Sequence, residues 1–350
     1  MIEQEIKRSE QVAQQQQQEP QNKSVPTNIS NLWQAYTGNS INVVFNQYSL
    51  QFLDDPKIRQ LCQLTLQYAQ YNVDKLEEIF HDLDFPVPIG FTDADVNLKA
   101  PRLFSDHFWL YFLNEMSVNG MIGYALSIGI SVSEMVRQFN KEAMNQAIEL
   151  YEKSLNLMQE FEVFDNFPQI SIPGIPEFAH QQSYLLSWFR GPSRTLDVLE
   201  ISSIYANLKK TILHKALAIA FSQVANLKEV REVMLENVKT TQNNIEEFMN
   251  VLHNDFLPSP RLWDSEITDS KIPPFSDRMM LTFISTLISL SLSNYGSGMS
   301  VSTRMDLAPI YSAAMARKGK LGYEVSRVLI DNGWLQQPPL APDRKMLAKS

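Results

Sequence analysis

The chain has 350 residues, of which 44% are hydrophobic, and a formal net charge of −9. This length is beyond the size at which a single core usually stops growing, and the apolar content suffices for packed cores, so we expect two domains and exclude global disorder. The acidic balance argues against a nucleic-acid partner, because phosphate binding needs a basic surface. The one cysteine suits a reducing compartment and no apolar signal segment follows Met1, so we expect a cytoplasmic protein.

The first 26 residues are polar and contain an uninterrupted glutamine run from Gln14 to Gln18. Such a segment has too few apolar side chains to bury. We therefore predict a disordered, Gln-rich arm over residues 1–26.

Apolar side chains then recur at helical spacing in four segments, at residues 30–53, 56–84, 106–130 and 133–161. Pro56 can open the second helix, since a first helical position needs no N–H donor. Ser105 is expected to cap the third helix, with Asp106 favourable near the positive end of the helix dipole. The third helix is apolar almost all round, but Asn114 and Glu115 would be costly in lipid, so we expect a protein-buried helix and no transmembrane segment.

Two short motifs around the loop after the second helix occur twice. Residues 85–88 (Phe-Pro-Val-Pro) correspond to residues 257–260 (Leu-Pro-Ser-Pro), and the Phe-Ser-Asp of residues 104–106 returns at residues 275–277. The proline motifs are 172 residues apart and the Phe-Ser-Asp motifs 171 apart. An offset that holds over two motifs predicts an internal repeat.

The repeat predicts a second set of four helices, at residues 196–225, 228–254, 276–300 and 306–332. Prolines and glycines mark the boundary between the two sets. We therefore expect these units: a four-helix bundle over 27–164, a Pro-containing linker over 165–195, a second bundle over 196–335 and a tail over 336–350.

The expected fold class is all-α, with two tandem ferritin-like four-helix bundles that arose by internal duplication. In each bundle a long crossover loop joins the second and third helices, at residues 85–105 and 257–275. A long connection in place of a hairpin is typical of ferritin-like bundles.

Several sequence blocks resemble a known family: residues 31–33 (Asn-Leu-Trp), 101–106 (Pro-Arg-Leu-Phe-Ser-Asp), 263–270 (Trp-Asp-Ser-Glu-Ile-Thr-Asp-Ser), 274–277 (Pro-Phe-Ser-Asp) and 331–335 (Asp-Asn-Gly-Trp-Leu) with Pro338-Pro339. Over about residues 28–348 the chain resembles an uncharacterised tandem ferritin-like family of spore-forming bacilli, related to spore-coat F-like proteins. The resemblance implies the fold, a sporulation context, and self-association or spore-coat proteins as partners. It implies no established activity.

The ferritin-like fold raises the question of a di-metal centre, which takes a Glu from each of two helices and a Glu-x-x-His from each of the other two. Glu78 and His81 form such a motif on a predicted helix, but the repeat counterpart has Asn250 in place of the acid before His253. Both histidines are expected at a helix end, where capping of terminal carbonyls is favoured over metal binding.

The first helix of each repeat has no carboxylate over residues 31–53 and 201–227. Members of the family that the chain resembles carry a histidine near position 72, whereas Asn72 and Asn244 stand here, and Asn is a poor ligand for transition metals. Cys62 corresponds to the apolar Met234, which favours a buried structural thiol over a nucleophile.

No catalytic residue and no cofactor are predicted, and the favoured function is a non-enzymatic structural or interaction protein. One alternative is a metal-binding ferritin-like protein or oxidoreductase that holds iron or manganese in a degenerate site, with four candidate ligands: Glu78, His81, Glu115 and Glu142. Another is a helical sensor of an apolar ligand. The crossover loops also carry acids that could bind a cation, although solvated loops are favoured, because the calcium-loop spacing is missing; these acids are Asp93, Asp95, Asp264, Glu266 and Asp269.

Overall fold

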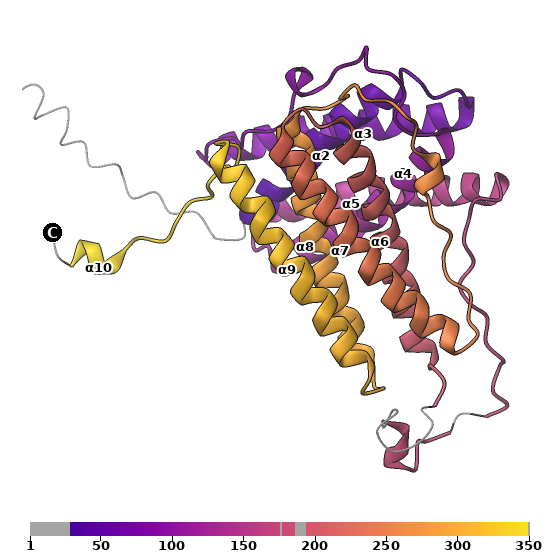
Figure 1. The fold of residues 1–350 in the computed structure, drawn as a ribbon. Coiled ribbons are helices and arrows are strands. Elements are labelled where there is room, and N and C mark those ends of the chain that lie inside the picture. The colour runs from indigo at the N-terminus through magenta and orange to yellow at the C-terminus, as the bar shows by residue number, and fades with distance from the viewer. Residues whose placement is uncertain (1–28, 176, 186–193, 349–350) are drawn as a thin grey trace, which may run out of the picture.

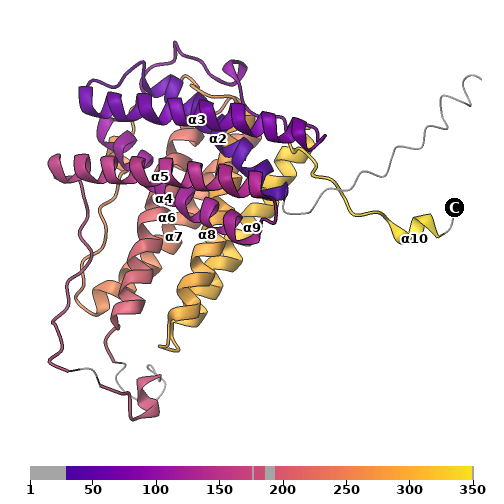
Figure 2. The same cartoon turned by 180° about the vertical axis from the view of Figure 1, so that it is seen from behind.

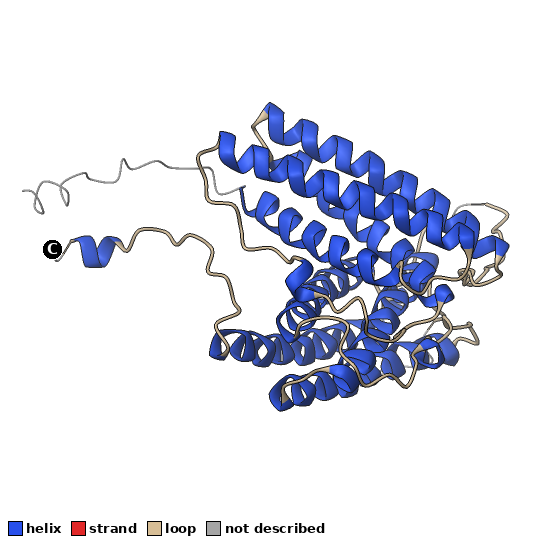
Figure 3. Ribbon diagram, turned by 90° about the horizontal axis from the view of Figure 1, so that it is seen from above, coloured by secondary structure: helices blue, strands red, loops and turns tan. Residues whose placement is uncertain are grey.

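The computed structural model describes residues 29–175, 177–185 and 194–348. Within these ranges the chain is helical and has no strand, and two isolated β-bridges are its only extended pairing (Figure 3). The long helices are α2 (Ile29–Ser49), α3 (Pro56–Asp82), α4 (Asp106–Ile130), α5 (Glu134–Glu160), α6 (Val198–Val224), α7 (Lys228–Asn254), α8 (Asp277–Val301) and α9 (Leu307–Asp331), and α10 (Arg344–Leu347) is a single turn in the tail. The arm expected over residues 1–26 lies outside the described residues.

The first helix is shorter than its apolar pattern predicts. It ends at Ser49, and the next residues form tighter turns in which Phe52 N–H donates to Ser49 O at 3.0 Å. The guanidinium of Arg59 donates to Leu50 O at 2.8 Å and to Leu53 O. The early end therefore has a tertiary cause, because a side chain of the next helix satisfies the terminal carbonyls.

The repeated Phe-Ser-Asp motif begins the third helix of each set as predicted, and it also joins that helix to its neighbours. Ser105 Oγ accepts the N–H of Phe108 at 3.1 Å, which confirms the cap. The Asp106 carboxylate accepts the backbone N–H groups of Asp54 and Asp55 at 2.9 and 2.8 Å. Asp277 binds the equivalent turn before α7 in the same way, so both copies of the motif hold the second and third helices together.

The helices pair within two sets, which we call the first half (α2–α5) and the second half (α6–α9). In the first half α2 packs on α3, α4 on α5 and α3 on α5, and the matching pairs of the second half do the same. The helices of the second half run alongside one another and cross those of the first half at a steep angle (Figures 1 and 2). None of the helices in the described ranges has the length and apolar content that a membrane span requires.

One large apolar core runs through both halves. The Phe45 ring lies between them, with its centroid 4.5 Å from that of Phe275 and 5.0 Å from that of Phe283. A smaller core belongs to the first half alone and includes Leu76 and Phe80. Because the larger core is shared, neither half buries its apolar surface by itself.

The two crossover loops pair with each other at the junction of the halves. Val96 forms a β-bridge with Phe275, and Phe104 forms one with Ile267. Asn97 N–H donates to Pro274 O at 2.8 Å, and the equivalent Thr268 N–H donates to Leu103 O at 3.0 Å. These contacts exchange with one another under the repeat offset, so the joint has approximate two-fold symmetry.

Most of the loop acids expected to face solvent instead have cationic partners. Asp95 is 8% exposed and lies 3.0 Å from Arg278. Asp264 lies 2.6 Å from Lys215, and Glu266 lies 3.3 Å from Arg261. The Asp95–Arg278 pair joins the two halves, whereas the other two pairs lie within the second half, and all three acids are paired with cations of the chain.

Candidate functional site

Each half has polar side chains at its centre, on helices that correspond under the repeat offset. The correspondence is visible in the contacts: Asn39 Nδ2 donates to Tyr124 Oη at 3.0 Å, and the equivalent Thr211 hydroxyl lies 3.0 Å from Tyr295 Oη. The pairs used below are Asn39 and Thr211, Asn42 and His214, Asn72 and Asn244, Tyr124 and Tyr295, Gln146 and Arg317, and Ala147 and Lys318.

In the second half a lysine and a histidine fill the centre. The amine of Lys318, on α9, is fully buried and donates to Thr241 Oγ1 at 2.8 Å and to Asn237 Oδ1 at 3.3 Å. His214, on α6, lies with Nδ1 3.3 Å from that amine and Nε2 2.9 Å from Asn237 Nδ2. We call these four residues the second-half polar core: His214, Asn237, Thr241 and Lys318.

One proton assignment turns each of these contacts into a hydrogen bond. Asn237 Nδ2 donates to His214 Nε2, His214 Nδ1–H donates to the lone pair of Lys318, and Lys318 donates to its two oxygen partners. This assignment requires an uncharged amine and an uncharged imidazole. Burial lowers the pKa of Lys318 to about 7, and burial is also the largest cause that lowers the pKa of His214 well below its usual range.

A second polar cluster, around Asn244, lies beside this core, and the amide of Asn244 is hydrogen-bonded through both its nitrogen and its oxygen. Asn244 Nδ2 donates to Tyr295 Oη at 3.3 Å, and Asn244 Oδ1 accepts an N–H from Arg317 at 2.7 Å. The guanidinium of Arg317 also pairs with Glu247. The Asn244 amide is thus satisfied at both ends.

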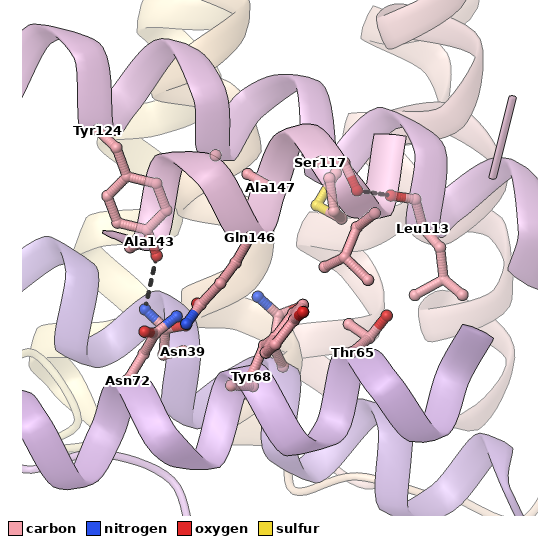
Figure 4. A pocket seen from close by; sticks show the side chains of 15 residues that line it. Asn39, Thr65, Tyr68, Asn72, Leu113, Ser117, Tyr124, Ala143, Gln146 and Ala147 are labelled. Carbon is pink, nitrogen blue, oxygen red and sulfur yellow. Dashed lines mark hydrogen bonds between the residues drawn. The ribbon is translucent and has the colours of Figure 1, made fainter. Parts of the chain in front are cut away.

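The first half has a cavity of about 70 Å³ at the equivalent place, which we call the first-half cavity (Figure 4). Ala147 stands where the second half has Lys318, and Asn42 stands where it has His214, so the side chains that fill the second half are cut short here. The wall combines amides, hydroxyls and apolar groups: Asn39, Asn42, Thr65, Tyr68, Ala69, Asn72, Leu113, Met116, Ser117, Gly120, Tyr124, Ala143, Gln146, Ala147 and Leu150.

Two amide oxygens on this wall lack hydrogen-bond partners within the described part of the chain. Asn39 Nδ2 donates to Ala35 O at 2.8 Å and to Tyr124 Oη, so its Oδ1 is the acceptor for Asn72 Nδ2 at 3.2 Å. Asn72 Oδ1 is therefore left over, and it is buried without a partner, as is Gln146 Oε1. In Figure 4 the Gln146 side chain reaches from α5 toward Asn39 and Asn72. A buried carbonyl oxygen without a hydrogen-bond donor lowers the stability of the fold, so a bound donor at this place would be favourable.

The hydroxyl groups on the wall add further acceptors. Ser117 Oγ donates to Leu113 O at 2.7 Å, and Thr65 Oγ1 donates to Leu61 O at 2.9 Å. Their protons are committed to these helical carbonyls, so only lone pairs face the cavity. These two hydroxyl oxygens add to the two free amide oxygens as acceptors, beside donors on the same wall such as the amide N–H groups of Asn42 and Gln146.

The candidate metal ligands lie apart from both centres. Glu78 is exposed and 2.7 Å from Lys75, and His81 is exposed in the last turn of α3. Glu142 accepts the Tyr71 hydroxyl at 2.9 Å on the surface. Glu115 is buried and 3.0 Å from Lys209 of the second half, where it joins the halves.

The central donor sets do not fit a di-metal centre, which needs carboxylates that face inward. The second-half polar core offers an amine, an imidazole, an amide and a hydroxyl, and no carboxylate lines the first-half cavity. Across the described ranges no group of three or more His, Cys, Asp or Glu side chains is arranged to hold a metal ion.

Cys62 is buried, as predicted from its apolar counterpart, but its thiol meets polar groups. Its thiol is 1% exposed and lies 2.9 Å from Ser49 Oγ and 3.0 Å from Asn46 Oδ1. Burial raises the pKa of Cys62 to about 12, so the thiolate that a nucleophile requires is disfavoured.

Comparison with known proteins gives a family and one similar structure. The model of a family described as a protein of unknown function, DUF3231, matches residues 16–174 and again residues 185–347. No curated protein matches the chain. The crystal structure of a candidate spore coat protein from Bacillus halodurans C-125 is similar at 18% identity and a TM-score of 0.39, over 43% of this chain and 98% of that one.

Proposed function

Since the chain belongs to the DUF3231 family of proteins of unknown function, we propose that it is a non-enzymatic structural or interaction protein made of two fused ferritin-like bundles, and that it associates with a second copy of itself. The observation that carries the proposal is an apolar surface at the end of α4, called the α4 patch and formed by Ile122, Leu126, Ile130 and Val132. Each of these side chains is more than half exposed.

Two of the three helical positions of the α4 patch are polar in the second half, and the third, Ile130, corresponds to the exposed Val301. Ile122 and Leu126 correspond to Ser293 and Ser297, which are exposed serines on α8. A scattered exposed apolar residue needs no explanation, whereas a contiguous group favours an interaction site. The serines of the second half show that the fold does not require apolar side chains at the Ile122 and Leu126 positions.

A second copy is the partner whose chemistry fits the α4 patch best. Ile122, Leu126 and Ile130 are four residues apart, so they form one stripe along the helix. Such a stripe is complementary to itself when two copies meet about a two-fold axis. Gly123 and Gly129 beside the stripe are exposed and have no atoms near a would-be Cβ, which lets a facing helix approach closely.

Sedimentation velocity over a range of concentrations tests the self-association. We expect a dimer, and we expect Ile122→Ser with Leu126→Ser, which installs the second-half residues, to weaken dimerisation at least about tenfold. Leu235→Ser is the matched control, because Leu235 is exposed on α7 and outside the patch. A wild-type chain that stays monomeric at every concentration would contradict the proposal.

The non-enzymatic part of the proposal is supported by the side chains at the two centres, which do not supply the carboxylates of a redox metal site. The alternative, an iron or manganese protein, is tested by metal analysis of the chain purified without chelators. Stoichiometric iron or manganese would replace our proposal with that alternative.

We place this role in the cytoplasm of sporulating cells, where the chain would join the spore and contact coat proteins. The support is the resemblance of the sequence blocks around both Phe-Ser-Asp motifs. Fractionation of spores from the source organism tests it: the protein should co-purify with the coat layers, and recovery from vegetative cells alone would refute the placement.

A further inference from the structure

The centres of the two halves differ at one equivalent position, which is Lys318 in the second half and Ala147 in the first. The second half fills its centre with the Lys318 amine, which donates to Thr241 and Asn237. The first half has Ala147 at the same position and a cavity of about 70 Å³ beside it. Relative to alanine, a lysine side chain adds three methylene groups and an amine, which is the group that the first half lacks.

The first-half cavity has acceptors for such an amine. Asn72 is 4% exposed and its Oδ1 has no partner, whereas the equivalent oxygen of Asn244 accepts an N–H from Arg317 at 2.7 Å. Gln146, the counterpart of Arg317, contributes a second unpartnered oxygen where the second half has a guanidinium. The amide contacts of Asn39 fix the orientation of the Asn72 amide, so the free atom facing the cavity is an oxygen.

The remaining wall suits a short hydrocarbon chain. Leu113, Met116 and Leu150 contribute apolar surface, and the ring of Tyr68 adds an aromatic one. About 10–15 Å³ of such space is enough for one water, so the cavity has room for a molecule of a few heavy atoms. Asn42, Tyr68 and Gln146 are half-buried, which marks the side on which the cavity approaches the surface.

From these contacts we infer that the first-half cavity is a binding site for a small primary amine, whose N–H groups donate to Asn72 Oδ1 and Gln146 Oε1 and whose alkyl chain lies on the apolar wall. The alkyl part of the ligand lies at the position of the Lys318 side chain, whereas its amine meets Asn72 and Gln146, which correspond to Asn244 and Arg317 and not to the Lys318 partners Asn237 and Thr241. The internal comparison favours an amine over a purely apolar ligand, because an apolar occupant would leave both oxygens unpaired.

Titration of the full chain with n-propylammonium chloride, followed by saturation-transfer NMR and calorimetry, tests the inference. This probe matches the part of lysine beyond Cβ. A ligand of this size can reach a dissociation constant of about 0.1–10 mM, and we expect saturable binding at one site per chain. Tetramethylammonium has the same charge but no N–H donor, and it should not compete.

Variants decide whether the site is the first-half cavity. Ala147→Lys should abolish binding, because the new side chain fills the cavity as Lys318 does in the second half. Ala316→Lys adds the same charge at an exposed position of α9 and should bind as the wild type does. Lys318→Ala should open an equivalent cavity and raise the stoichiometry to two.

Three results would overturn the inference: no saturable binding below about 50 mM, equal binding by Ala147→Lys, or equal competition by tetramethylammonium. The first would mean that water alone occupies the cavity. Far-ultraviolet circular dichroism of each variant confirms that the helices remain, and Ala147→Lys should also unfold at a higher denaturant concentration than wild type if its amine satisfies the free oxygens.

Discussion

Phe112 and Phe283 are equivalent residues of the two halves, and their rings meet with centroids 6.1 Å apart. Two copies of one position can touch only near an axis that relates the halves. The loop pairing has the same symmetry, since the Val96–Phe275 bridge exchanges with the Phe104–Ile267 bridge. The chain is thus joined much as a two-fold dimer would be, with both partners in one polypeptide.

Replacing a phenylalanine at this axis by alanine should destabilise both halves together. Phe112 is fully buried in the shared core, so Phe112→Ala should lower the free energy of unfolding by about 3–5 kcal/mol. Chemical denaturation should still show one transition. The double variant with Phe283→Ala should lose less than the sum of the single losses, because the two rings share a contact. Two well-separated transitions in the wild type would contradict a shared core.

The Asp95–Arg278 ion pair in the crossover loops should contribute more to the free energy of unfolding than the exposed Asp93 does. The Asp95 carboxylate accepts the Ser276 hydroxyl at 2.7 Å and lies 3.0 Å from Arg278. Asp95→Asn should lower the free energy of unfolding by about 1–3 kcal/mol, because it leaves a half-buried guanidinium poorly paired. Asp93→Asn is the matched control, since Asp93 is exposed and its carboxylate accepts an N–H from Gln47 at 3.2 Å. Equal losses in urea titrations would show that the pair contributes nothing specific.

The helices and their order could be predicted from the sequence because they depend on local periodicity and capping. Ser105 and Pro56 act where their chemistry places them. The end of α2 at Ser49 could not be predicted, because the guanidinium of Arg59 in the next helix decides it. The pairing of the crossover loops could not be predicted either. The repeat offset shows which positions are equivalent, but it gives no information on which positions are in contact.

The two centres were partly visible in the sequence. The repeat offset already aligns Ala147 with Lys318 and Asn42 with His214, and a loss of side-chain volume at two aligned positions indicates a cavity. The unpaired Asn72 oxygen depends on the orientation of the Asn39 amide, which no pattern encodes. Glu115 was predicted as a candidate metal ligand, but its partner Lys209 lies in the other half.

The thiol of Cys62 should be unreactive in the folded chain. Burial raises its pKa to about 12, so the thiolate is scarce at pH 8, and the side chain is 1% exposed. Iodoacetamide should therefore alkylate Cys62 only after unfolding in urea, as mass spectrometry of the intact chain will show. Rapid alkylation without denaturant would mean that the region around α2 and α3 opens readily.

The second-half polar core should make stability depend on pH above neutrality. Lys318 has a folded pKa of about 7 and an unfolded pKa of about 10.4. Between these values the unfolded chain binds the extra proton, so the free energy of unfolding rises with pH, by up to about 1.4 kcal/mol per unit, and the penalty of the buried amine is fully present below pH 7.

Lys318→Met should remove this dependence, because methionine fills similar space and does not titrate. In urea titrations at pH 7.5 and 9, the wild type should gain stability with pH more than Lys318→Met does, and the variant should be the more stable of the two at pH 7.5 if the buried amine outweighs its hydrogen bonds. Lys320→Met, at an exposed position on the same helix, should keep the wild-type slope. If Lys318→Met and wild type had equal slopes, the buried amine would be protonated throughout, and the neutral assignment of the His214–Lys318 contact would be wrong.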